Sequence, residues 1–108
     1  MADRTRHGGA EIVNLLKTGS AFYAPASSAV AMASSILNDE KRLLPCACYL
    51  NGHFGVEGVY TGVPAILGKE GVERIVELPL TTEARINMQK TVGAIQADLE
   101  ELRNLGLL

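Results

Sequence analysis

The chain has 108 residues, a length that accommodates one domain with its own core but not a nucleotide-binding domain plus a second domain. Its formal net charge is -2, from 10 Lys and Arg residues against 12 Asp and Glu residues without a basic block, so we expect no nucleic acid partner. Although 47% of the residues are apolar, no run approaches the ~20 residues that cross a bilayer, and no secretion signal follows the charged start. We therefore expect a cytoplasmic protein without a membrane partner.

Two helices are expected within residues 8–37. Apolar residues recur at helical spacing near the start of this stretch, at Ile12, Val13, Leu15 and Leu16. Gly19 and Pro25 predict a break or kink between Lys17 and Pro25, because glycine loosens a helix and proline removes a backbone donor. Residues 24–33 form a small-residue surface, which would let another backbone approach closely. We expect this second helix to be buried against a large partner surface.

Three strand-like runs follow, at residues 43–50, 58–67 and 72–78. Residues 51–52, an Asn-Gly pair, supply a turn after the first run. In the third run, alternation predicts the inward side chains Val72, Ile75 or Val76, and Leu78. Three sequential strands predict an antiparallel meander.

A long last helix is expected at the C-terminal end of the chain. Thr81 or Thr82 can cap its start, and Gly106 is expected to stop it. Its apolar face is predicted to comprise Ile86, Val92, Ile95, Leu99 and Leu102. The order helix, helix, three strands, helix predicts a single α+β domain over residues 1–108, with helices packed on an antiparallel sheet.

Four ordered segments carry a family resemblance. They are Arg-Thr-Arg-x-Gly-Gly-Ala-Glu-Ile at residues 4–12, Gly-Ser-Ala-Phe-Tyr-Ala-Pro at 19–25, Gly-Val-Tyr-x-Gly-Val-Pro at 58–64, and Gly-Val-Glu-Arg-Ile at 71–75. Together they resemble the C-terminal, substrate-side domain of lactate/malate dehydrogenases over nearly the whole chain. Lactate dehydrogenases carry a Gly-Tyr-Thr-type segment where this chain has residues 19–25, so the malate branch is the better match.

The resemblance implies an oxidoreductase that moves a hydride between NAD and the alcohol carbon of malate, giving oxaloacetate. In the family, an Asp-oriented His exchanges the proton and arginines clamp the carboxylates. The family's Gly-rich NAD loop and Gly-His-Gly-Asp-type turn have no match here, so we assign no catalytic residue and regard the N-terminal NAD-binding domain as absent. We expect this chain alone to be inactive and to bind no NAD. That N-terminal half and identical subunits are the expected partners.

Two positions are carried over through the resemblance. Ser20 occupies the place where lactate dehydrogenases have a Thr lining the substrate pocket, so its hydroxyl is expected to bond a substrate carboxylate or the nicotinamide. The alternative is that Ser20 only caps the helix that follows Gly19. Ala24 is expected near the nicotinamide, where a small side chain leaves room for the ring, and a packing role alone is equally open.

The histidines and cysteines suggest no chemistry of their own. His7, at a helix start, is expected to be a surface residue. Cys46, Cys48 and His53 together offer three metal ligands without a convincing fourth, so no metal site is predicted. The two cysteines are expected to be buried small side chains.

Two other functions remain open. A lactate dehydrogenase C-terminal domain is one, because the loop that discriminates between the two substrates lies outside this chain. The other is a non-catalytic oligomerisation or binding module that pairs with itself through its small-residue helices. An uncovered Ala-rich helix leaves apolar area in water at ~25 cal/mol per Å², so we expect the isolated chain to associate or aggregate.

Overall fold

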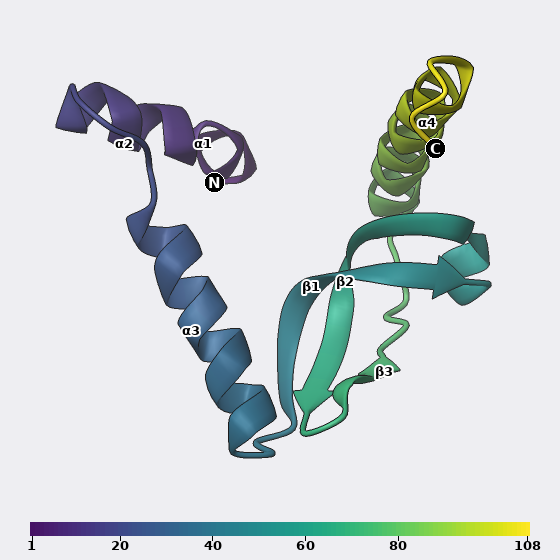
Figure 1. The fold of residues 1–108 in the computed structure, drawn as a ribbon, viewed down its shortest axis with the longest axis horizontal. Helices are drawn as coiled ribbons and strands as arrows, with labels where there is room; N and C mark the ends of the chain where they lie inside the picture. The colour runs from purple at the N-terminus through teal and green to yellow at the C-terminus, as the bar shows by residue number, and fades with distance from the viewer. The chain divides into compact units, whose positions relative to one another are not determined.

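The computed structural model describes residues 1–108, apart from the side chain of residue 2, and confirms an α+β fold (Figure 1). The elements are α1 (Ala2–Arg6), α2 (Gly8–Leu16), α3 (Tyr23–Leu37), β1 (Arg42–Asn51), the short 3-10 helix η1 (His53–Gly55), β2 (Glu57–Gly68), β3 (Gly71–Ile75) and α4 (Thr82–Asn104). The chain divides into two compact units, Met1–Ser34 and Ser35–Leu108. Among the helices described, none has the length and apolar character needed to cross a membrane.

The expected break between the first two long helices is confirmed, and it lies before α3. Lys17 ends α2 in the left-handed conformation, with φ of 62°, and its backbone N–H donates to the Val13 carbonyl at 3.0 Å. Gly19 continues the break with φ of 88°. Pro25 is the third residue of α3 rather than part of the break. A proline is tolerated there because first-turn N–H groups have no partner within the helix.

The small-residue surface of α3 remains largely exposed. Of the residues in α3, only Ser35 is buried, and it belongs to the second unit. The large partner surface expected for this helix is therefore not supplied within Met1–Ser34.

The sheet is the predicted antiparallel meander, in the order β1-β2-β3. The third strand is shorter than predicted, since β3 ends at Ile75. The predicted inward positions Val72 and Leu78 are wrong, because both side chains are about half exposed. Val72 lies in the edge strand β3, whose pairing with β2 is irregular between Ile66 and Leu67, and the chain leaves the sheet before Leu78.

The core lies on one face of the sheet. Alternate residues of β1 and β2 are buried there: Cys46, Cys48, Leu50, Val63, Ala65 and Leu67.

From α4, Met88 packs against this cluster and Val92 is buried, whereas Ile95 and Leu99 are partly buried. The predicted stripe is therefore wrong at Ile86, which is exposed. Ile86 precedes Met88 by two residues, which places it on nearly the opposite side of a helix. Leu102 is also exposed, close to the helix end.

Both predicted ends of the last helix are confirmed. The side chain of Thr81 accepts a hydrogen bond from the Ala84 backbone N–H at 3.2 Å. At the other end Gly106 adopts φ of 69°, and the Leu107 backbone N–H donates to the Leu102 carbonyl at 3.0 Å. This bond satisfies a carbonyl that the helix leaves without an internal partner.

Candidate functional site

The segment between α2 and α3 holds the first predicted site residue, Ser20. Its side chain is exposed, and its carbonyl accepts a hydrogen bond from the Phe22 backbone N–H at 3.0 Å. Among the residues described, the Ser20 hydroxyl forms no hydrogen bond. The hydroxyl is therefore available to a ligand as a donor and as an acceptor.

Ala24, the second predicted site residue, lies in the first turn of α3. Its side chain is exposed, and the rings of Phe22 and Tyr23 stack just before it with centroids 4.7 Å apart. An exposed methyl group leaves room for a flat ring but offers no polar atom to hold one. The structure therefore shows space beside Ala24 but no group there that would bind a ligand by a polar contact.

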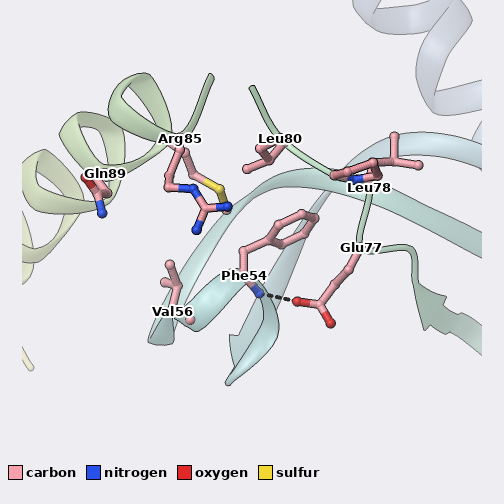
Figure 2. A pocket seen from close by; sticks show the side chains of 10 residues that line it. Phe54, Val56, Glu77, Leu78, Leu80, Arg85 and Gln89 are labelled. Carbon is pink, nitrogen blue, oxygen red and sulfur yellow. Dashed lines mark hydrogen bonds between the residues drawn. The ribbon is translucent and has the colours of Figure 1, made fainter. Parts of the chain in front are cut away.

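A pocket in the second unit was not predicted from the sequence. It has a volume of about 350 Å³ and is formed where η1 meets the link before α4 and the first turns of that helix (Figure 2). Phe54 lies at its centre, in the left-handed conformation with φ of 56° and ψ of 18°. The backbone N–H of Phe54 donates to the carboxylate of Glu77, 23 residues away. The sequence contains one signal for this pocket: Arg85 and Gln89 are four residues apart, a spacing that places both side chains on the same side of a helix.

Polar side chains of this pocket come from opposite sides. Arg85 and Gln89 project from α4, whereas Glu77 points to the Phe54 backbone (Figure 2). Among the described residues, no carboxylate lies within 4.0 Å of the Arg85 guanidinium. An unpaired guanidinium beside partly buried apolar side chains is chemically suited to an anion with an apolar body.

The residues weighed for metal or thiol chemistry lie in structural settings. His7 is exposed as predicted, with Nδ1 2.8 Å from the Asp3 carbonyl oxygen. Cys46 and Cys48 are buried free thiols as predicted, and burial raises the pKa of both. Among the described residues no three His, Cys, Asp or Glu side chains gather as a metal site would need. His53 Nδ1 is buried without a hydrogen-bond partner in the part of the chain described.

Each of the two units contains its own group of ion pairs. In the first unit, the Arg4 guanidinium binds both oxygens of Glu11 at 2.8 and 3.1 Å, which raises the pKa of Arg4 and lowers that of Glu11. In the second unit, Lys41 bonds the Glu73 carboxylate at 2.8 Å and lies 3.1 Å from Asp39. The Lys69 backbone N–H, 3.0 Å from Asp39 Oδ1, and Lys41 lower the pKa of Asp39. These pairs are structural, because each charge already has its partner.

Comparison with known proteins gives a consistent family. The family model for the lactate/malate dehydrogenase, alpha/beta C-terminal domain, matches residues 1–105. The lactate dehydrogenase from Eimeria maxima, solved with NADH and oxamate, is 41% identical with a TM-score of 0.91, over 96% of this chain and 32% of that one. The malate dehydrogenase from Cryptosporidium parvum is 46% identical with a TM-score of 0.87, over 94% and 32%.

A third solved structure, the malate dehydrogenase from Salinibacter ruber, is 40% identical with a TM-score of 0.85, over 97% of this chain and 35% of that one. The chain thus spans about a third of the length of the dehydrogenases it matches. Its four sequence segments, its meander and its long last helix agree with that assignment. The chain therefore belongs to the lactate/malate dehydrogenase family and matches the model of its α/β C-terminal domain over residues 1–105.

Proposed function

We propose that this chain is the substrate-side part of an NAD-dependent malate dehydrogenase, which oxidises malate to oxaloacetate in the cytoplasm. The observation that carries this proposal is the family match over residues 1–105. The choice of malate over lactate is supported by residues 19–25, which have the malate-branch pattern rather than a Gly-Tyr-Thr-type segment.

In this proposal, Ser20 binds substrate and Ala24 makes room for the cofactor. The Ser20 hydroxyl is exposed and unbonded within the described chain, so it can donate to a substrate carboxylate without breaking another contact. The nicotinamide ring lies beside the exposed Ala24 methyl group, which is small enough to leave room for the ring. NAD, when bound, supplies the hydride acceptor. The proton-exchanging His, the arginine clamps and the NAD loop come from an N-terminal half, and identical subunits are further partners.

Lactate dehydrogenase is the second candidate. The Eimeria maxima lactate dehydrogenase has a TM-score of 0.91 with this chain, so the fold of this domain suits either substrate. The two substrates differ by a carboxylate, and a site built to pair that group rejects an analogue lacking it strongly. In this proposal, the loop that discriminates between the two substrates lies outside this chain, so residues 19–25 carry the preference for malate.

The test is an assay of NADH oxidation with oxaloacetate and, separately, with pyruvate. The chain is measured alone and after mixing with a family N-terminal half that carries the NAD loop and the catalytic turn. We expect activity with oxaloacetate only in the mixture. Preference for pyruvate would replace malate by lactate, and activity of this chain alone would contradict the assignment of its catalytic groups to another segment.

Ser20→Ala tests the substrate role within the same mixture. Because a hydrogen bond to a charged group contributes about 1.5–3 kcal/mol, we expect KM for oxaloacetate to rise roughly 10- to 100-fold. Ser28→Ala, an exposed serine in the middle of α3, is the matched control and should leave KM unchanged. An unchanged KM in both variants with lower stability in Ser20→Ala would assign Ser20 to capping instead.

A further inference from the structure

We propose that the pocket between η1 and the start of α4 binds a small carboxylate with a compact apolar body. This pocket contains neither Ser20 nor Ala24 and stands apart from the proposed dehydrogenase function. Its volume of about 350 Å³ falls in the range of small-molecule sites.

The apolar part of the ligand would rest on the pocket's partly buried side chains. Phe54, Val56, Leu80 and Met88 contribute these walls, and they come from three separate segments. Figure 2 shows the Phe54 ring directed toward the link that carries Leu78 and Leu80, with Val56 on its other side. Aromatic and aliphatic walls of this kind favour an apolar body about the size of one ring.

The position of the Phe54 ring is fixed by its backbone. A left-handed conformation is costly for a bulky residue and persists only where the surroundings hold it. The Glu77 carboxylate, which accepts a hydrogen bond from the Phe54 backbone N–H, supplies that restraint, and Gly55 follows with φ of 72°. The ring is therefore preorganised in the pocket, which lowers the entropy lost when a ligand binds.

The charged end of the ligand would pair with Arg85. On the same helix, Arg103 already binds Glu100 at 3.3 Å, whereas the Arg85 guanidinium has no carboxylate within 4.0 Å among the described residues. Gln89, one turn later, places an amide donor on the same side (Figure 2). The acid that lines the pocket, Glu77, is occupied by the Phe54 backbone.

These donors suit a carboxylate better than a phosphate. A guanidinium binds both oxygens of a carboxylate in one plane, and one side-chain amide can add a third bond. A phosphate has more oxygen atoms than a carboxylate and nearly twice its negative charge. The apolar walls of the pocket would leave the additional oxygens without hydrogen-bond donors. The chemistry therefore points to a monocarboxylate carrying a ring or a short branched chain.

The test is an NMR titration of the ¹⁵N-labelled 108-residue chain with 3-phenylpropanoate, with 3-phenylpropanamide and inorganic phosphate as comparison probes. We expect saturable amide shifts at Phe54, Gly55, Leu80, Arg85 and Gln89, with Kd of about 1 mM for a ligand of this size. The uncharged amide and phosphate should bind at least roughly tenfold more weakly.

Arg85→Gln should weaken binding of the carboxylate at least roughly tenfold, because it removes the positive charge while still offering side-chain N–H donors. Arg103→Gln is the matched control on the same helix and should bind as the unchanged protein does. The spectrum of each variant without ligand reports whether it is folded. Absence of saturable shifts, equal binding of the amide or of phosphate, or equal weakening by Arg103→Gln would each overturn the proposal. Loss of self-association in Arg85→Gln without carboxylate binding would overturn it in favour of a second copy of the chain.

Discussion

The buried hydroxyl of Ser35 donates a hydrogen bond of 2.7 Å to the carbonyl oxygen of Leu67. The same hydroxyl oxygen accepts a bond from the Arg42 backbone N–H at 3.3 Å. Ser35 is the one buried residue of α3, and Leu67 and Arg42 face each other on β2 and β1. One side chain thus joins the end of a helix to two strands inside Ser35–Leu108.

Ser35→Ala should lower the free energy of unfolding by about 1–3 kcal/mol, because it leaves the buried Leu67 carbonyl and the partly buried Arg42 N–H without this partner. Urea unfolding followed by circular dichroism measures the change. Ser28→Ala, on the exposed side of the same helix, is the control and should be neutral or slightly stabilising. Equal effects of the two substitutions would show that the Ser35 bonds contribute nothing.

Gly68→Ala should destabilise the sheet by up to about 1 kcal/mol, because the added methyl group displaces two carboxylates that pair with Lys41. A methyl group at Gly68 would lie 2.8 Å from Asp39 Oδ1 and would also overlap the Glu73 carboxylate, so the ion pairs with Lys41 would have to shift. Gly62→Ala on the same strand is the control, since its methyl group would meet no atom within 4 Å. Thermal unfolding should separate the two variants, and a stable Gly68→Ala protein would contradict the contact.

Thr81→Ala should cost about 1 kcal/mol, because its side chain caps α4 by accepting from the Ala84 backbone N–H. Thr82→Ala changes the same kind of side chain one residue later, where the structure gives no cap bond, and should have a smaller effect. Urea midpoints at constant m-value measure both. A larger loss at Thr82 would place the helix cap one residue later than the structure does.

Asp39 should make stability depend on pH in the acid range. Its pKa lies below the ordinary value of 3.8 because the Lys69 backbone N–H and Lys41 favour the charged form. The stabilisation is therefore complete above pH 3.8 and is lost as the pH falls through the lower pKa of the folded state. The stability difference between the unchanged protein and Asp39→Asn should shrink on acidification below about pH 4.

Urea unfolding at a series of pH values measures that difference. Asp98→Asn is the control, since Asp98 is exposed and forms no ion pair with the residues described. A difference for Asp39→Asn that grows as the pH falls would contradict the depressed pKa.

Cys46 and Cys48 should resist thiol reagents in the folded protein. Both are buried, and burial raises the pKa of each thiol, so less of the reactive thiolate is present at neutral pH. Reaction with an aromatic disulfide reagent should be slow without denaturant and complete for two thiols in guanidinium chloride. Fast reaction in the absence of denaturant would show that the core face of β1 opens readily.

The amino-acid sequence determined most of the local structure. Thr81 and Gly106 predict the ends of the last helix through their own bonding and backbone preferences, and the apolar run around Cys46 and Cys48 predicts that both are buried. The family resemblance also follows from ordered segments of the chain. These features depend on near neighbours, so a linear pattern is enough to predict them.

Tertiary structure alone decided which side chains meet across the fold. Val72 is exposed in the short edge strand β3, where the pairing with β2 is irregular, and the stripe of α4 contains Met88 instead of Ile86 because of how the helix lies on the sheet. The pocket requires the Phe54 backbone to meet Glu77, 23 residues later, and Arg85 to lie beside them. Such contacts are set by packing between distant segments, whose energies depend on three-dimensional fit and leave no period in the sequence.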